Sequence, residues 1–264
     1  MNNKNIVAVV QARLGSTRMP NKILMPIDKE GKESLLEFFI KRLKHSKKIT
    51  KIVLATTIQP RDDLLVEYAK KLGIPYYRGS EDDVLDRTYG AAKENKADIV
   101  IRVTSDCPLN DPVMIDQMVE EFFKRKCDYL CNRKPPTYPD GFDTEIFTFA
   151  ALEKAAKEAT FKFEREHVTP YISEHTEIFK VENVVYKFDR SYVRLTVDYT
   201  EDYELIKQVY TALYPKNPNF TLDDIVEYLD AHKELLNLND KYVRDAAYHK
   251  QKDEELKKAK EVKK

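Results

Sequence analysis

The sequence contains few of the residues that would assign it to several large classes of protein. It has no tryptophan, six glycines and three cysteines among 264 residues. The cysteines, Cys107, Cys127 and Cys131, form no Cys-x-x-Cys pair, so neither a disulfide framework nor a zinc site is supported. We expect them to be small buried hydrophobic residues. With 45 basic and 45 acidic residues the formal net charge is zero, which argues against broad electrostatic capture of nucleic acid or an anionic membrane.

The start of the chain has no long hydrophobic run. Five aliphatic residues, Ile6 to Val10, follow a short polar stretch and are themselves followed by polar sequence. That run is too short for the apolar region of a signal peptide or for a membrane span. We therefore expect a cytoplasmic protein whose partners are small molecules rather than a membrane or a nucleic acid.

Strand and helix patterns alternate through the first half of the chain. Short apolar runs predict strands at 6–10, 52–55, 75–78 and 99–103. Helices are predicted after Ser34, which begins a capping box with Glu37, and after Asp111, which precedes a proline. Two further helices are predicted at 62–72, ended by Gly73, and from a Ser80 cap to Ala92. This order is typical of a Rossmann-like α/β fold with a mostly parallel mixed sheet flanked by helices.

The second half of the chain has a different character. Three prolines and the turn sequence Tyr138 to Gly141 predict a small inserted segment at about 135–190, within a main domain of residues 1–240. Within or beside it, strands are predicted at 144–149 and 178–186, and helices at 150–159 and 167–173. Residues 194–198 are predicted to be a final strand of the main sheet, followed by helices near 201–213 and 222–229. The charged end, 241–264, is expected to be a solvated or frayed helix or tail.

The segment from Gln11 to Lys22 has the composition of a phosphate-binding loop. It follows the first predicted strand, at the edge of the sheet where open α/β folds bind ligands. Arg13, Arg18 and Lys22 offer cations to phosphate oxygens, and Gly15 allows backbone N–H groups to face an anion. A nucleoside triphosphate would suit these groups, although a solvated loop with scattered basic residues is equally compatible with the residue types alone. The segment matches neither Gly-x-x-x-x-Gly-Lys-Ser/Thr nor Gly-x-Gly-x-x-Gly, which weakens ATPase and dinucleotide-binding interpretations.

Two aspartates are predicted to reach the same edge of the sheet. Asp106 follows the predicted strand 99–103, and Asp198 ends the predicted strand 194–198. Carboxylates beside a bound triphosphate are the ligands that Mg²⁺ requires, since phosphates and waters complete its octahedral shell. Each aspartate is also compatible with capping the helix or turn that follows it.

Five sequence blocks, taken in order, resemble the spore-coat polysaccharide cytidylyltransferases, which are related to the CMP-sialate and CMP-Kdo synthetases. The blocks are 11–22, 105–109, 139–143, 164–171 and 194–198, and the resemblance extends over residues 6–213. It implies the fold of the nucleotide-diphospho-sugar transferases. It also implies Mg²⁺-dependent transfer of CMP from CTP to a small acceptor, with release of pyrophosphate. The product would be a precursor of a surface polysaccharide, such as a capsule, and the inserted segment would bind the acceptor and pair two subunits as a homodimer.

The resemblance also implies roles for individual residues. The nucleotide would be bound by Gln11, Ala12, Arg13, Gly15, Ser16, Thr17, Arg18, Lys22, Arg78, Arg87 and Ser105. Catalytic roles would fall to Arg13, Arg18, Lys22 and Asp106, with Asp106 and Asp198 as metal ligands. The acceptor would be bound by Asp143, Glu145, Arg165 and His167.

Several assignments stay open at the level of sequence. Asp83 suits base selection, but we prefer a capping role for it. His167 is compatible with a general base or donor that acts on a hydroxyl acceptor. It is equally compatible with a histidine whose hydrogen bonds are satisfied within a helix, and a phosphate acceptor needs no base. A related glycosyltransferase would normally carry Asp-x-Asp where this chain has Ser105-Asp106-Cys107. A catalytically silent nucleotide-binding or assembly module would release no pyrophosphate with any triphosphate.

Overall fold

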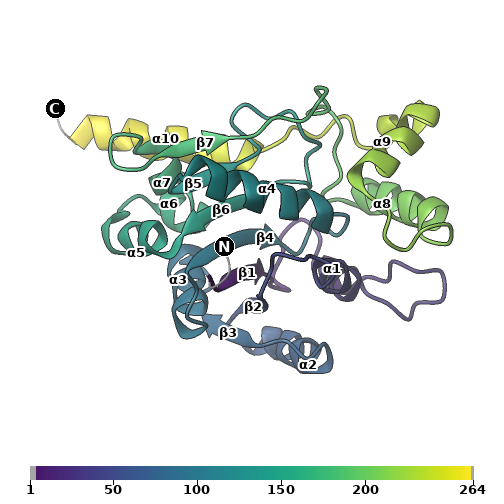
Figure 1. The fold of residues 1–264 in the computed structure, drawn as a ribbon, viewed down its shortest axis with the longest axis horizontal. Coiled ribbons are helices and arrows are strands. Elements are labelled where there is room, and N and C mark those ends of the chain that lie inside the picture. The colour runs from purple at the N-terminus through teal and green to yellow at the C-terminus, as the bar shows by residue number, and fades with distance from the viewer. Residues whose placement is uncertain (1–3, 263–264) are drawn as a thin grey trace.

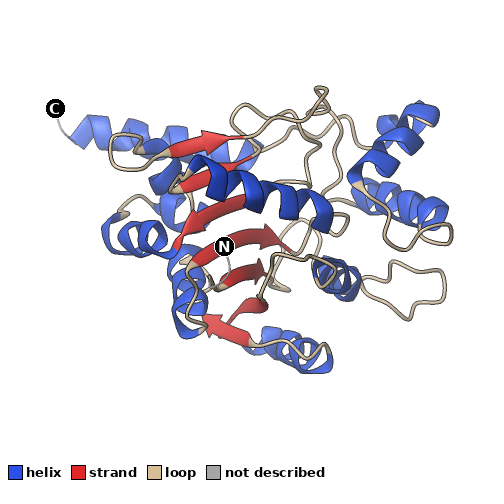
Figure 2. Cartoon of the chain, viewed as in Figure 1, coloured by secondary structure: helices blue, strands red, loops and turns tan. Residues whose placement is uncertain are grey.

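A seven-stranded sheet runs through the computed structural model, which describes residues 4–262, and helices cover both of its faces (Figures 1 and 2). Its spatial order is β3-β2-β1-β4-β6-β5-β7. Strand β6 runs antiparallel to β4 and β5, and every other neighbouring pair is parallel. The predicted mostly parallel mixed α/β sheet is therefore confirmed. The strands are β1 (Ile6–Gln11), β2 (Lys51–Thr57), β3 (Tyr76–Gly79), β4 (Ile99–Thr104), β5 (Tyr129–Cys131), β6 (Glu145–Thr148) and β7 (Val181–Asn183).

Strand β1 lies at the centre of the core because its side chains are apolar on both faces of the sheet. Ile6, Ala8 and Val10 pack into one hydrophobic cluster, and Val7 and Val9 into the other. The first cluster is covered by α1 (Leu35–Leu43), α2 (Asp63–Lys71), α4 (Pro112–Arg125), α8 (Thr200–Leu213) and α9 (Leu222–Ala231). The second is covered by α3 (Val84–Glu94), α5 (Phe149–Glu158) and α7 (Pro170–Glu174), and α6 (Lys162–His167) packs against α3 and α7.

The helix starts are fixed by side chains that bond to free backbone N–H groups. The Glu37 backbone N–H donates to Ser34 Oγ, and the Ser34 backbone N–H donates to Glu37 Oε2, so the predicted capping box is present. Asp111 caps α4 through the Val113 N–H, also as predicted. Helix α3 differs, because its N-cap is Asp83 rather than Ser80. The preferred capping role of Asp83 is thereby confirmed.

The chain changes direction across the sheet at β1. Strands β2 and β3 lie on one side of β1 and β4 lies on the other, so the loops after β1 and β4 leave the same edge in opposite directions. This separation opens a crevice at the carboxyl ends of the strands, which is where open α/β sheets bind ligands. The loop after β1 ends at a short 3₁₀ helix, η1 (Lys22–Leu24), and a second one, η2 (Pro60–Asp62), leads into α2.

Residues 194–198 do not form the predicted strand of the main sheet. Within the described chain their one strand-like bridge joins Arg194 to Asp140, and β6 occupies the position beside β4. The segment instead runs along two loops, where the Leu195 N–H donates to the Asp140 carbonyl (2.7 Å) and the Val197 N–H to that of Asp106 (2.8 Å). Its alternating apolar residues are buried without a strand ladder, which explains the wrong prediction.

The C-terminal segment forms a helix, one of the two forms expected for it. After η3 (Lys233–Leu238), helix α10 (Ala246–Val262) lies along α6, at the yellow end of the chain in Figure 1. Gln251 contacts His167 and Glu166, and Glu255 accepts a hydrogen bond from the Phe163 N–H. Its described residues are all exposed or partly exposed, and an apolar pattern could not indicate its polar contacts with α6.

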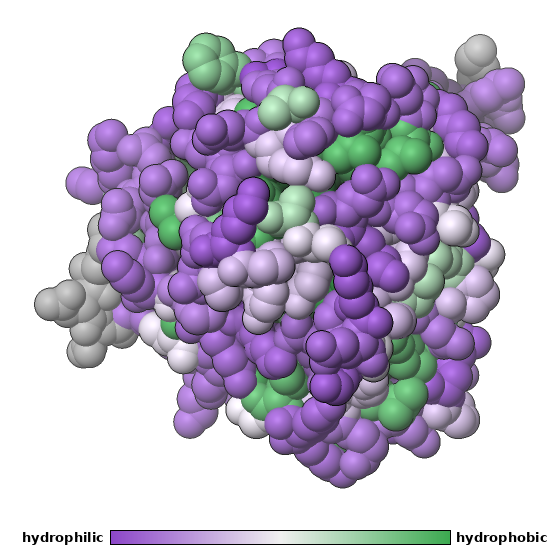
Figure 3. Space-filling view, turned by 90° about the vertical axis from the view of Figure 1, so that its right-hand side faces the viewer, coloured by the Kyte–Doolittle hydropathy of each residue, from purple (hydrophilic) through white to green (hydrophobic). Residues whose placement is uncertain are grey.

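The surface is mainly polar where Figure 3 displays it. That view looks at the side on the right of Figure 1, and its apolar side chains form small separate patches among hydrophilic ones. Among residues 4–262, no helix combines the length and the apolar character needed to cross a bilayer.

Gly141 provides a test of how tightly the 194–198 segment is packed. Its φ is +101°, and a Cβ at this position would lie 2.5 Å from the Leu195 carbonyl carbon. We predict that Gly141→Ala lowers the free energy of unfolding by more than about 3 kcal/mol, because a strained conformation and a backbone clash combine. Gly31 is the matched control. Its φ is +71°, but no atom of residues 4–262 beyond its chain neighbours lies within 4 Å of a Cβ added there. Gly31→Ala should cost about 1 kcal/mol. Equal losses for both variants in urea unfolding would contradict the packing described.

Candidate active site

Lys22 joins the two aspartates that sequence analysis assigns to a metal site. Its Nζ donates to Asp106 Oδ2 at 2.9 Å and to Asp198 Oδ1 at 2.7 Å. Asn21, in the left-handed conformation with φ 59°, turns the loop into η1 and so directs Lys22 inward. The contact links the loop after β1 with the loop after β4 across the crevice.

The charges of Lys22 and Asp106 hold each other ionised. Burial tends to lower the pKa of Lys22, but the Asp106 and Asp198 charges more than offset this and raise the pKa above 10.5. Burial likewise opposes ionisation of Asp106, while the Lys22 charge and hydrogen bonds bring the pKa of Asp106 down to about 2. At neutral pH the site therefore contains an ammonium group between two carboxylates.

Asp198 is oriented by three cations. Arg18 reaches Oδ1 at 2.6 Å, beside Lys22, and Arg194 reaches Oδ2 at 3.0 Å. The Arg18 guanidinium also lies 5.6 Å from the centre of the Tyr199 ring, close enough for a cation–π contact. Buried Arg194 is fixed in turn by Asp140 and Asp202, both at 2.9 Å. The carboxylate is thus held rigidly although the segment that carries it is not a strand.

The paired carboxylates fit the protein's share of a Mg²⁺ site. No group of three or more His, Cys, Asp or Glu side chains within residues 4–262 is arranged to hold a metal ion. Magnesium does not need such a cage, because it binds through one or two carboxylates and takes its other ligands from phosphates and water. Oxygens of Asp106 and Asp198 already meet at a single nitrogen, and Asp106 is partly exposed to the cavity.

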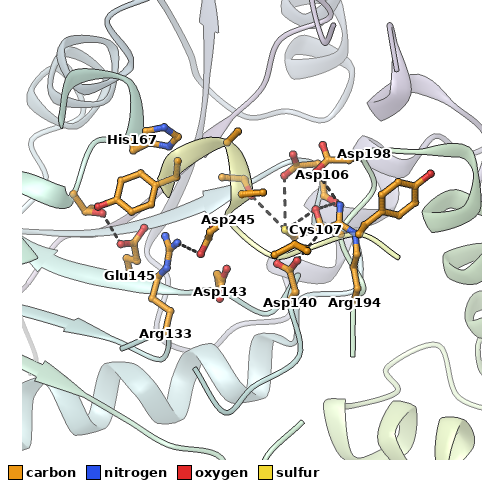
Figure 4. A pocket seen from close by; sticks show the side chains of 18 of the residues that line it. Asp106, Cys107, Arg133, Asp140, Asp143, Glu145, His167, Arg194, Asp198 and Asp245 are labelled. Carbon is orange, nitrogen blue, oxygen red and sulfur yellow. Dashed lines mark hydrogen bonds and ion pairs between the residues drawn. The ribbon is translucent and has the colours of Figure 1, made fainter. Parts of the chain in front are cut away.

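A cavity of about 460 Å³ extends from this cluster into the second half of the chain. Figure 4 shows Asp106, Asp198 and Arg194 at one end and Glu145, Arg133 and His167 at the other. Its size suits a ligand such as a small sugar. Three of the four predicted acceptor residues, Asp143, Glu145 and His167, line the cavity.

These three side chains are held by protein partners. Glu145 is buried and accepts hydrogen bonds from Tyr129 and Thr169, both at 2.5 Å. Burial opposes its ionisation, but Arg102 and Arg133 lower the pKa of Glu145 to about 2. Burial raises the pKa of Asp143 despite its pairing with Arg244. Burial also lowers the pKa of His167, whose Nε2 lies 3.1 Å from Gln251 Oε1.

Arg165, the fourth predicted acceptor residue, does not line the cavity. Its Nε donates to Asp83 Oδ2 at 2.6 Å, and its Nη1 donates to the carbonyls of Ala156 and Ala159. These bonds connect α6 to the start of α3 and the end of α5. The structure therefore gives Arg165 a role in helix packing.

The predicted nucleotide residues surround the loop after β1, but only Arg18 among them lines the cavity. Gln11 donates to Thr88 Oγ1 (2.9 Å), and Arg78 donates to the carbonyls of Thr57 (2.8 Å) and Gln59 (3.0 Å). Arg87 donates to the carbonyl of Ser80, and its buried Nε has no hydrogen-bond partner among residues 4–262. The backbone N–H of Ala12 donates to the Ala55 carbonyl, and that of Ser105 donates to the Gln11 carbonyl. Ser16 Oγ accepts a long hydrogen bond from the Met19 N–H. Thr17 is exposed.

The space beside Gly15 is filled by the end of a flexible side chain. Positive φ occurs at Asn21 in this loop and not at Gly15. A Cβ on Gly15 would lie 2.5 Å from Arg61 Nη2, so the glycine makes room for that guanidinium. Arg61 in turn pairs with Glu81, whose carboxylate is 3.8 Å from Arg13. Arg61 was not predicted, since nothing in its local sequence connects it with the first loop.

The three cysteines have no role in this chemistry that the geometry supports. All are free and buried, as predicted. Burial raises the pKa of Cys107 well above its usual range, so its thiol stays protonated at neutral pH.

The fold and the cluster are typical of a nucleotidyltransferase, in which paired carboxylates and loop cations meet at the carboxyl edge of a mostly parallel sheet. Residues 7–238 match the family model described as cytidylyltransferase. The chain therefore belongs to the cytidylyltransferase family of enzymes.

Three similar proteins extend over most of the chain. An uncharacterized protein of Methanocaldococcus jannaschii, MJ1063, is 39% identical over 246 residues, which span 92% of this chain and 97% of that protein. The spore coat polysaccharide biosynthesis protein SpsF of Bacillus subtilis is 32% identical over 236 residues, with 86% and 94% covered. The solved structure of a cytidylyltransferase from Leptospira borgpetersenii is 35% identical, with a TM-score of 0.84 and coverage of 92% and 99%.

Lys22→Met tests the charge cluster through the pH dependence of stability. The variant keeps a long side chain but leaves the two carboxylates facing each other, and we predict a loss of about 2 to 3 kcal/mol at neutral pH. A pKa of Asp106 near 2, below 3.8, stabilises the folded state above about pH 4. That contribution is lost as the pH falls through 2. The raised pKa of Lys22 stabilises the folded state below pH 10.5, and this contribution is lost at more alkaline pH.

The difference in unfolding free energy between wild type and Lys22→Met should therefore be widest near neutral pH. This difference should narrow as the pH drops from about 4 toward 2. Urea unfolding at a series of pH values measures it. A difference that stays constant over this range would show that Lys22 and Asp106 are not electrostatically coupled.

Proposed function

We propose that the protein transfers CMP from CTP to a small acidic acceptor in a Mg²⁺-dependent reaction that releases pyrophosphate. The observation that carries this proposal is the contact of Lys22 with Asp106 and Asp198 at the crevice between β1 and β4. The cluster combines a polyphosphate-binding loop with two metal-binding carboxylates. The adjoining cavity provides space for the acceptor beside it.

In this mechanism the acceptor oxygen attacks the α-phosphorus in line with the departing pyrophosphate. The protein mainly positions the reactants and neutralises charge. Arg18 and Lys22 pair with the β and γ phosphates, because negative charge accumulates there as the bond to the α-phosphorus breaks. Asp106 and Asp198 would hold Mg²⁺, which neutralises phosphate charge and helps to orient the reacting oxygens when it is bound.

The acceptor is proposed to be a sugar acid, a sugar phosphate or another small phosphorylated metabolite. The cavity wall carries Arg133 and Lys134 at the end distant from Asp106, and such cations suit an anionic group. Burial lowers the pKa of His167, so its ring is neutral near pH 7. Because it lies at the end of the cavity away from Asp106 and Asp198, we assign it to contact with the acceptor rather than to proton transfer. The similarity to SpsF supports a product used in surface polysaccharide synthesis.

A nucleotide panel tests the donor. The protein is incubated with Mg²⁺ and each of CTP, UTP, GTP and ATP, together with sugar acids, sugar phosphates and polyol phosphates, and pyrophosphate is measured. We expect release with CTP and an acceptor, and little with the other triphosphates. Release with another triphosphate but none with CTP would contradict the proposed donor, and none with any triphosphate would favour a silent binding module.

Asp106→Asn tests the metal carboxylate. We expect kcat to fall by about 10² to 10³, because the variant removes charge that balances the metal and phosphates in the transition state. Asp98→Asn is the matched control, since Asp98 lies beside β4 at its opposite end and bonds to Asn5 and Lys4. The control should retain near wild-type turnover. Equal activity of both variants would remove Asp106 from the catalytic site.

A further inference from the structure

The acceptor end of the cavity is closed by a part of the chain that lies outside the family match. The match ends at residue 238, yet residues between Lys241 and Tyr248 form one wall of the cavity. In Figure 4 this segment brings Asp245 against Arg133, between Glu145 and Asp143. The shape and charge of this end of the cavity therefore depend on a segment beyond the residues that the family model matches.

Asp245 places a carboxylate on the main cation of the acceptor end. Its Oδ2 lies 2.6 Å from Arg133 Nη2, and the Arg133 side chain is only 19% exposed. Asp245 adopts the left-handed conformation, with φ 54°, in the residue before α10 begins. That conformation is uncommon for residues other than glycine, asparagine and aspartate. The chain thus turns sharply at the point where its carboxylate enters the cavity.

Lys134, next to Arg133, has no carboxylate within hydrogen-bond distance among residues 4–262. Its Nζ donates to Ser173 Oγ at 2.7 Å, and the nearest acidic oxygen, Glu174 Oε1, is 4.0 Å away. Glu174 is itself engaged by Lys252 at 2.5 Å and by Tyr248 at 2.9 Å. Among the described residues, Asp245 is the one carboxylate within 4.0 Å of Arg133, although the charges of Glu145 and Asp143 also act on this guanidinium.

Aromatic and polar contacts hold the C-terminal segment here. Tyr242 stacks on Tyr199, and Tyr248 packs edge-on against Phe163 and His167. The polar contacts lie on α10. They join Gln251 to His167, Glu255 to the Phe163 N–H and Lys252 to Glu174. Arg244 pairs with Asp143 in the same way as Asp245 pairs with Arg133. Both pairs are mostly buried, so Asp245 leaves Arg133 at low cost only when another anion takes its place. The segment can thus leave the cavity without disturbing the sheet, whose core is formed by other residues.

We propose that Arg133 and Lys134 form the binding site for the anionic group of the acceptor, a carboxylate or a phosphate. Asp245 occupies this site in the free enzyme, and the acceptor displaces it together with the segment around it. The C-terminal segment is then an internal competitor that sets the apparent affinity for the acceptor. The identity of the anion as part of the acceptor rests on the proposed function, whereas the displacement of Asp245 by an anion does not.

Amide hydrogen exchange of residues 241–250 in the full-length protein tests the displacement without any nucleotide. Inorganic phosphate and acetate are the probes, and chloride at equal ionic strength is the reference. We expect phosphate, acetate or both to speed exchange in this segment at least fivefold relative to chloride, and the more effective anion indicates the acceptor's acidic group. Equal exchange in all three salts would overturn the proposal, because ordinary screening would then explain any change.

Variants assign the effect to the proposed groups. Asp245→Asn should exchange rapidly without added anion and respond little to it, whereas Asp253→Asn, an exposed position on the same helix, should behave as wild type. Arg133→Gln should abolish the response, and Lys134→Gln, which removes no ion pair shorter than 4.0 Å, should reduce it if the first variant does not fold. A wild-type response in both Asp245→Asn and Lys134→Gln would contradict the assignment.

An acceptor that is turned over with CTP adds a kinetic test. Asp245→Asn should lower its KM severalfold and Lys134→Gln should raise it, with the KM for CTP unchanged in both. A structural role alone would shift both variants in the same direction. If no acceptor is turned over while the exchange response is present, the proposed function fails and the anion site stands.

Discussion

A single buried ammonium group connects the parts of the chain on which the site depends. Lys22 follows the first strand, Asp106 follows the fourth, and Asp198 precedes α8, yet the three side chains meet within hydrogen-bond distance. Burying any one of these charges alone would be costly, so each is stable only with the others present. The crevice, the first loop and the 194–198 segment are therefore fixed relative to one another by this cluster, to which we assign the proposed nucleotide and metal sites.

The two ends of the cavity are built differently. At the proposed nucleotide end, the sheet edge supplies rigid positions, and Arg194, which also pairs with Asp140 and Asp202, holds Asp198 in place. At the acceptor end, the wall consists of the inserted segment and the chain after residue 238, joined mainly by ion pairs and hydrogen bonds between side chains. Such a division allows one nucleotide-binding edge to serve different acceptors, because the acceptor wall can change without altering the core.

The sequence predicted the alternating first half of the fold well, because local signals there agree with the tertiary structure. Strand β1 is apolar throughout, and Ser34 and Asp111 cap the helices that they precede. It failed where long-range contacts decide the outcome. Residues 194–198 have the alternation of a strand but pair with loops, and the brief strand β5 has no pattern of its own. Arg61 and Asp245 were missed because only folding brings them to Gly15 and Arg133. Arg165 was placed in the site by resemblance, while its actual partner is Asp83.

Metal binding in the presence of nucleotide tests the central claim most directly, because it depends on the cluster and on no particular acceptor. Mn²⁺, titrated in place of Mg²⁺ and followed by electron paramagnetic resonance, can be compared with and without CTP. The account predicts that CTP strengthens Mn²⁺ binding to the wild-type protein, and that Asp106→Asn and Asp198→Asn each weaken the CTP-dependent binding at least tenfold. Unchanged CTP-dependent Mn²⁺ binding in both variants would contradict the assignment of these carboxylates and of the site built around Lys22.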